Sequence, residues 1–260
     1  MARIIGITSG NGGVGKTTIV SNLGVILSKY FNKRVTIVDC NVTNSHLALY
    51  FGMYYFPVTI NKVMRDNVKI EEAMYKHYSG VYIVPASLSL SDLRGVDIVK
   101  LKSVVEPLRE KNDIIILDGS PGLGRESMAM LNACDEILYV TTPIMSSLVD
   151  IVRYKEVLNE INKKSVGIII NMKRNIKNEL GNSEIEKFTD MKVISSIPFD
   201  KNVYKSLAVG SPVFLSNAKS KASREFLKMA SWIAEEELKQ PKFSKLMQKF
   251  SIINMFKDFN

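Results

Sequence analysis

The feature that most constrains this chain is a glycine-rich loop, Gly10-Asn-Gly-Gly-Val-Gly-Lys16-Thr-Thr18. It matches the pattern GxxxxGK[ST] and stands between a β-branched segment and a segment of helical periodicity, as a phosphate-binding loop requires. Glycines let the backbone N–H groups and the positive end of the following helix point at phosphate oxygens. We expect Lys16 to contact the β- and γ-phosphates of a nucleoside triphosphate and Thr17 to bind Mg²⁺. The expected nucleotide-binding residues of the loop are Gly10, Asn11, Gly12, Gly13, Val14, Gly15, Lys16, Thr17 and Thr18.

Short apolar, β-branched segments alternate with segments of helical periodicity along the chain. This order is typical of parallel strands joined by crossover helices, and near-continuously apolar strands are covered on both faces. We therefore predict an α/β fold with a doubly wound, mostly parallel sheet flanked by helices, the P-loop NTPase architecture. The predicted strands are 3–8, 34–39, 81–85, 114–118, 136–141, 166–171 and 192–198, and the predicted helices are 16–30, 96–111, 126–134, 147–162, 183–189 and 218–238.

Two acidic residues stand at the carboxyl ends of predicted strands, where α/β sheets present their ligand sites. Asp39 closes one strand, and Asp118 follows four aliphatic residues at the end of another. Asp118 has the context of a Walker B residue that holds Mg²⁺ through water. The predicted metal-binding residues are therefore Thr17, Asp39 and Asp118.

Composition leaves several partners open. The 260 residues contain 35 Lys and Arg against 26 Asp and Glu, a net charge of +9 that suits nucleic acid, an anionic membrane surface or a phosphorylated ligand. The two cysteines, Cys40 and Cys134, form no disulfide framework and no metal-ligand spacing, which favours a reducing cytoplasm. Since no stretch approaches the roughly 18 apolar residues of a membrane span, we expect any membrane contact to be peripheral.

Beyond the loop, further segments resemble the MinD/ParA group of P-loop ATPases, and most closely archaeal-type MinD. They include switch I (38–43 with 47–52), switch II (118–124), Val140-Thr-Thr-Pro143 and Ile197-Pro-Phe-Asp200 running to Gly210-Ser-Pro-Val213. The resemblance covers the chain to about residue 238 and implies an ATP-dependent homodimer that sandwiches two nucleotides and separates on hydrolysis. It also implies that Asn171 reads the base and that Pro198 lines the adenine.

Two positions depart from the family pattern. The second motif position, usually a lysine that crosses the dimer interface to the partner's phosphates, is Asn11, and the usual second acid of switch I is Asn41. Losing a stabiliser of the phosphoryl-transfer transition state typically costs on the order of 100- to 1000-fold in rate, and losing a carboxylate slows water activation further. Counting Asn11, Lys16 and Asn41 as the catalytic residues, we expect a slow Mg²⁺-dependent ATPase that binds ATP normally. The alternative is that Asn11 still donates a hydrogen bond and another residue takes over.

The last 20 residues differ from the body. We predict a P-loop ATPase domain over 1–240 and an amphipathic, membrane-targeting tail over 241–260, which stands apart after Pro241. Residues 239–260 contain five lysines and one aspartate, so +4 of the +9 lies beside apolar stripes, as in helices that lie in an anionic membrane interface. The alternative is that the tail docks on the body or on a partner protein. The two stripes are Phe243, Leu246, Met247 and Phe250, and Ile252, Met255, Phe256 and Phe259.

Several functions compete on this sequence. A cytoplasmic switch on the inner face of the cell membrane, MinD-like, would place the division site or a polar or motility apparatus through an unidentified protein partner. A ParA-like DNA partitioning ATPase would use the basic charge, but the apolar tail speaks against it. A nucleotide-binding scaffold without turnover follows if hydrolysis is lost. An iron–sulfur carrier would need cysteines bridging a dimer.

Overall fold

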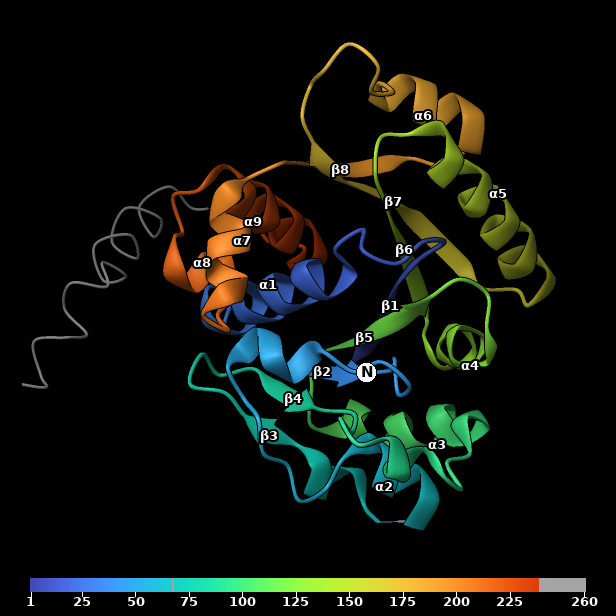
Figure 1. Cartoon of the computed structure of the whole chain (residues 1–260), viewed down its shortest axis with the longest axis vertical. Helices are drawn as coiled ribbons and strands as arrows, with labels where there is room; N and C mark the ends of the chain where they lie inside the picture. Colours follow the sequence, from blue (N-terminus) through green and yellow to red (C-terminus); the bar gives the residue numbers. More distant parts are fainter. Residues whose placement is uncertain (67, 239–260) are drawn as a thin grey trace, which may run out of the picture.

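Eight strands form one sheet in the order β3-β4-β2-β5-β1-β6-β7-β8, in which only β3 runs antiparallel to its neighbour (Figure 1). The computed structural model describes residues 1–66 and 68–238. From the central β1 the chain moves first toward β2 and later toward β6, which confirms the predicted doubly wound sheet. The strands are β1 (Arg3–Ser9), β2 (Val35–Asp39), β3 (Tyr75–Lys76), β4 (Tyr82–Val84), β5 (Ile114–Pro121), β6 (Glu136–Thr141), β7 (Lys164–Lys173) and β8 (Val193–Pro198).

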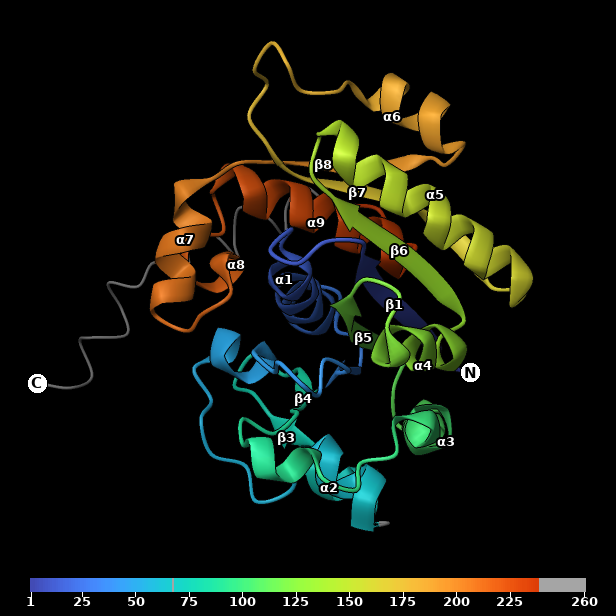
Figure 2. The ribbon, with the colours of Figure 1, turned by 45° about the vertical axis from the view of Figure 1, so that its right-hand side comes forward.

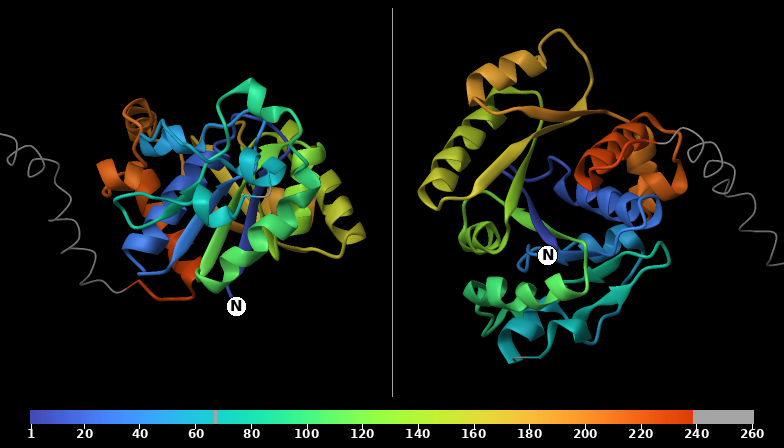
Figure 3. Two further views of the ribbon diagram at one scale, coloured as in Figure 1. Left: turned by 90° about the horizontal axis from the view of Figure 1, so that it is seen from below. Right: turned by 180° about the vertical axis from the view of Figure 1, so that it is seen from behind.

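Helices cover both faces of the sheet (Figure 2). Alternate side chains of each buried strand point to opposite faces, so Ile116 packs in the core under α1, α8 and α9, and Leu117 packs in the core under α2 to α6. The views from below and behind show the same layers (Figure 3). The helices are α1 (Lys16–Lys29), α2 (Ile60–Asp66), α3 (Leu101–Val105), α4 (Arg125–Ala133), α5 (Met145–Glu160), α6 (Asn182–Thr189), α7 (Lys201–Ala208), α8 (Val213–Ser216) and α9 (Lys221–Ala234).

The helix predicted over 96–111 is wrong as one element. The structure has α3, a five-residue α-helix, between 3₁₀ turns at Ile98–Lys100 and Glu106–Glu110. The Asp97 side chain accepts a hydrogen bond from the Val99 N–H (3.2 Å) and so starts a separate turn. Pro107 lacks the N–H that a continuing α-helix needs. The apolar positions still face the core, so the pattern located the buried face but not the break.

The last predicted helix ends four residues early. Helix α9 stops at Ala234, and Glu235 adopts a left-handed conformation (φ 55°). Three consecutive glutamates at a helix carboxyl end oppose the helix dipole. Salt bridges from Arg3 to Glu235 (3.1 Å) and from Lys33 to Glu236 (2.8 Å) hold the chain outside the helix. The described chain therefore ends beside the amino end of β1.

Periodicity missed three short helices: α2, which lies between β2 and β3, and α7 and α8, which lie between β8 and α9. Within residues 1–66 and 68–238, none of the helices has the length and hydropathy to cross a bilayer. The predicted amphipathic tail, 241–260, lies outside the described residues.

Candidate phosphate-binding site

The loop between β1 and α1 is shaped by glycines at positions that other residues would strain. Gly13 and Gly15 have φ angles of 76° and 93°, in the left-handed region. A Cβ on Gly15 would lie 2.3 Å from Nδ2 of Asn171, whose side chain donates a hydrogen bond to the Val14 carbonyl (2.7 Å). No side chain caps α1, so the N–H groups of its first turn are free to bind an anion.

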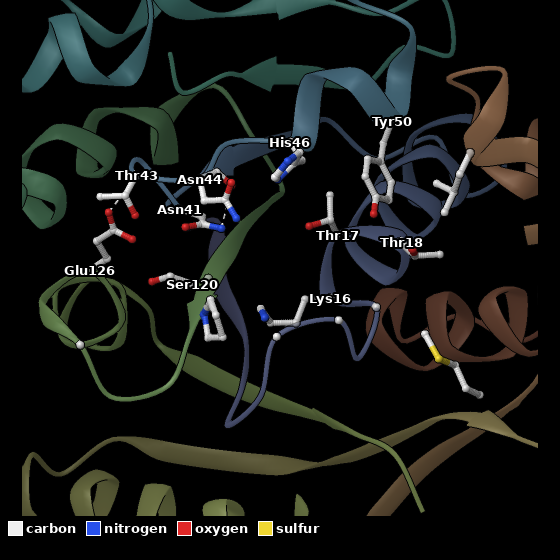
Figure 4. A pocket seen from close by; sticks show the side chains of 18 of the residues that line it. Lys16, Thr17, Thr18, Asn41, Thr43, Asn44, His46, Tyr50, Ser120 and Glu126 are labelled. Atoms are coloured by element: carbon white, nitrogen blue, oxygen red, sulfur yellow. Dashed lines mark hydrogen bonds between the residues drawn. The ribbon is translucent and has the colours of Figure 1, made fainter. Parts of the chain in front are cut away.

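The side chain of Lys16 projects into a pocket of about 850 Å³ above this loop. Its Nζ donates to the Ser9 hydroxyl (2.8 Å), which in turn donates to the Asn11 carbonyl (2.7 Å). Burial lowers the pKa of Lys16, and the nearby Asp118 carboxylate opposes that shift. The ammonium group is thus held inside the pocket by one neutral hydroxyl, which leaves it able to bind oxyanions. Figure 4 shows Lys16 beside Thr17, with Ser120 and Asn41 across the same hollow.

The two predicted acids meet on neighbouring strands. Asp39 at the end of β2 pairs in register with Asp118 of β5, and both are buried. Asp39 accepts hydrogen bonds from the Ser45 hydroxyl (2.7 Å) and the Asn41 N–H (3.0 Å). In contrast, Oδ1 of Asp118 is buried without a hydrogen-bond partner, and the nearby Thr17 hydroxyl opposes the rise in the pKa of this carboxyl. A buried carboxylate oxygen without a partner, next to a hydroxyl, suits an oxygen-preferring cation.

No group of three or more His, Cys, Asp or Glu side chains able to hold a metal occurs in the part of the chain that the structure describes. Mg²⁺ does not require one, because it usually takes one or two carboxylates and completes its shell with phosphate and water. Thr17, Asp39 and Asp118 therefore fit such a shared site.

Because this pair is buried, the stability of the protein without ligand should depend on pH. Burial raises the pKa of Asp39 to about 6 and that of Asp118 to about 7, from 3.8. The folded state thus keeps protons that the unfolded state releases, and the free energy of unfolding falls as the pH rises from about 4 to about 7. In Asp118→Asn, denaturant titrations should show a much smaller fall, with a gain over wild type at about pH 8 on the order of a few kcal/mol.

His77 also makes stability depend on pH, because burial lowers its pKa to about 4 and its protonation destabilises the fold in acid. Since His77 is present in both proteins, the difference between wild type and Asp118→Asn reports the aspartate. Asp190→Asn is the matched control, since Lys155 lowers the pKa of that exposed carboxyl. Parallel pH profiles of wild type and Asp118→Asn would contradict the prediction.

The residues implied for base recognition lie at a second, smaller cavity of about 160 Å³ that shares Thr18 with the loop. Asn171 and Pro198 both line it, although 27 residues separate them in sequence. The sequence analysis did not identify the other residues that line this cavity, most of which belong to β7, α7 and the chain between β8 and α7. An apolar slot beside a phosphate pocket can accept a flat base. The missed lining residues include Met172, Phe199, Val203, Tyr204 and Leu207.

The two departing asparagines are placed differently. Asn41 lines the large pocket, and its Nδ2 donates to the Asn44 carbonyl (2.9 Å). Asn11 is exposed and is not among the residues that line this pocket. Within one subunit the structure therefore brings Asn41, and not the Asn11 side chain, to the site.

Sequence reasoning missed the residues that join the two switch segments. Glu126 accepts a hydrogen bond from the Thr43 N–H (3.0 Å), as Figure 4 shows. The preceding Arg125 lines the same pocket. Tyr50 and His46 of the switch I region also line it. Nothing local marks Glu126 or Arg125, because each looks like an ordinary exposed helix residue until the fold places it.

A phosphate-binding loop between β1 and α1, with paired acids on β2 and β5 of a doubly wound sheet, defines a P-loop NTPase. A family model described as ParA, NUBPL iron-transfer P-loop NTPase, matches residues 1–234. The chain belongs to the ParA/MinD family of P-loop NTPases.

Individual relatives agree with this placement. An uncharacterized ATP-binding protein of Methanocaldococcus jannaschii is 34% identical over 254 residues, covering 98% of this chain and 96% of its own. The septum site-determining protein MinD of Thermotoga maritima is 30% identical over 245 residues, covering 91% and 89%. The structure of MinD from Pyrococcus horikoshii complexed with Mg-ADP superposes with a TM-score of 0.86 at 29% identity, covering 90% of this chain and 96% of that one.

Proposed function

We propose that this protein is a MinD-like switch that binds ATP with Mg²⁺ and forms an ATP-dependent homodimer acting as a membrane-associated spatial regulator. The observation that carries the proposal is the pocket lined by Lys16, Thr17 and the start of α1, with the buried Asp39–Asp118 pair of β2 and β5 next to Lys16 and Thr17. Lys16 and the loop would hold the phosphates, Thr17 and the two aspartates would hold Mg²⁺, and Asn171 and Pro198 would border the adenine. The ion, when bound, would neutralise phosphate charge.

The same residues support slow hydrolysis. Asn41 contributes a neutral amide to the pocket where a carboxylate would orient water, and its amide is engaged by Asn44. The exposed Asn11 could reach a nucleotide only in a second subunit, and there it would bring no charge. The protein would thus persist in its ATP-bound dimer, which suits a positional marker for the division site or a polar or motility apparatus.

A direct test uses light scattering to measure the molar mass of the protein in solution with ATP, with ADP and with neither. Each measurement is made in Mg²⁺ and in EDTA. We expect a dimer only with ATP and Mg²⁺. A monomer with bound ATP would refute the dimer while leaving nucleotide binding intact. Retention on DNA that falls steeply with salt would favour the partitioning function instead.

The membrane role rests on the tail and on where the described chain ends. Glu235 and Glu236 are held by Arg3 and Lys33 at the amino ends of the strands, whereas the nucleotide pocket lies at their carboxyl ends. A tail leaving this end would stay clear of a dimer interface built over the pocket. Two tails per dimer would raise avidity for an anionic surface and make attachment ATP-dependent.

Deletion of residues 241–260 is therefore expected to abolish ATP-dependent cosedimentation with anionic vesicles, with ATP affinity unchanged. The control is Gln248→Ala with Ser251→Ala, which changes polar residues of the tail and leaves its apolar residues and lysines in place. Vesicle binding by the deletion variant at the wild-type level would reject the membrane role.

An iron–sulfur carrier function finds no support in the geometry. Cys40 and Cys134 are both buried, and burial raises the pKa of each thiol. Neither presents a thiolate on the surface from which a cluster could bridge two subunits.

A further inference from the structure

The large pocket carries a second fixed positive charge that the family comparison does not explain. Among its lining residues, Lys16 and Arg125 are the Lys and Arg side chains. Lys16 is buried at the foot of the pocket, whereas Arg125 is exposed at the rim. The pocket is therefore positive at two levels, although the usual lysine at position 11 is absent.

Arg125 stands where a cation does not help the fold. It is the first residue of α4, at the positive end of the helix dipole, and the N-cap Gly124 offers no side-chain cap. No ion pair or side-chain hydrogen bond of Arg125 occurs among residues 1–66 and 68–238, and the neighbouring Glu126 is engaged by the Thr43 N–H (3.0 Å). A cation with an unfavourable position and no partner in the protein suits an anionic ligand.

The start of α4 is also firmly mounted. The Ser127 hydroxyl donates to the Ser120 carbonyl (3.0 Å), which ties the helix to the switch II loop directly after Asp118. The Gly122 N–H donates to the Ser9 carbonyl (2.9 Å), next to the phosphate-binding loop. The backbone around Arg125 is thus held on both sides, and its side chain projects from a defined point on the rim.

We propose that Arg125 binds the terminal phosphate of the triphosphate in its own subunit and supplies the positive charge that Asn11 does not. A guanidinium can make two parallel hydrogen bonds to phosphate oxygens, and a contact at the rim would discriminate ATP from ADP. This inference rests on the proposed function, because it assigns a residue of the same nucleotide site.

The test measures dissociation constants for ADP and for the non-hydrolysable analogue AMP-PNP, in Mg²⁺, at protein concentrations below dimerisation. We expect wild type to prefer AMP-PNP, and Arg125→Ala to bind it about tenfold more weakly with ADP changed less than twofold. Arg125→Lys should lie between the two. Arg224→Ala is the matched control, because Arg224 is also exposed in the first turn of a helix, α9, and does not line the pocket.

Equal weakening of both nucleotides, or unchanged affinities in Arg125→Ala, would overturn the assignment while leaving the proposed ATP site standing. A preference for AMP-PNP that appears only when the protein dimerises would overturn binding within one subunit. If wild type binds neither nucleotide, the proposed function itself fails. Arg125→Gln, checked by its thermal unfolding, distinguishes a lost contact from a lost fold.

Discussion

Replacing Lys16 by alanine is expected to lower the affinity for ATP on the order of 100-fold, because hydrogen bonds from an ammonium to phosphate oxygens are charge-assisted. Lys16 is buried in the pocket, where its Nζ donates to the Ser9 hydroxyl (2.8 Å). Because Lys16 is the lysine among the residues that line this pocket, no other ammonium group there can replace it. Its removal also leaves the Asp39–Asp118 pair without the nearby positive charge that lowers the pKa of Asp118. Titration calorimetry with ATP and Mg²⁺ measures the loss.

Lys29→Ala is the matched control for this experiment. Lys29 closes the same helix, α1, at the end remote from the phosphate-binding loop, so its removal should leave ATP affinity unchanged. Affinity for ATP within about threefold of wild type in Lys16→Ala would contradict both the site and the proposed function.

The double variant Asn11→Lys, Asn41→Asp is expected to hydrolyse ATP at least roughly 100-fold faster than wild type, because it restores a cation and a carboxylate to the reaction. The structure adds a condition. Since Asn11 is exposed outside its own pocket, the lysine should act on the partner's nucleotide, and the gain should grow with protein concentration as dimers form. Phosphate release over a range of protein concentrations tests both points.

The aspartate at position 41 carries a cost. It would remove the hydrogen bond from Asn41 Nδ2 to the Asn44 carbonyl and would add a third carboxyl near Asp39 and Asp118. Asn41→Asp alone should therefore destabilise the protein without Mg²⁺ through repulsion among the carboxyls, and Mg²⁺ should relieve that repulsion. Asn32→Lys with Asn159→Asp is the charge-matched control, because both positions lie outside the pocket. Wild-type turnover as fast as that of the double variant would refute slow hydrolysis.

The sequence predicted the parts of the site whose cause is local. The phosphate-binding loop follows from a strand, a run of glycines and a helix that are consecutive in the chain. Asp39 and Asp118 could be placed at one sheet edge because parallel strands end at the same edge. Helical periodicity also located the last described helix, α9, although not where it ends. The break in the predicted helix 96–111 could not be predicted in the same way. The apolar spacing is helical throughout, but the Asp97 cap and Pro107 divide the segment into separate turns.

The remaining features depend on residues far apart in the chain. The amide of Asn171 reaches the Val14 carbonyl across 157 positions and lies 2.3 Å from where a Cβ at position 15 would stand. Glu126 of α4, which follows switch II, bonds to Thr43 of switch I across 83 positions. Such contacts are decided by which strands become neighbours, and no local pattern encodes that choice.

What the sequence by itself determined is the class of chemistry, because the loop and the two strand-end acids are fixed by short-range pattern and by the rule for parallel sheets. The tertiary structure alone decided which side chains line the pocket. It placed Asn41 inside and Asn11 outside, and it brought Arg125 to the rim. The physical reason is that backbone geometry is largely local, whereas a pocket is formed by packing between distant segments, and its charges are known only once those segments meet.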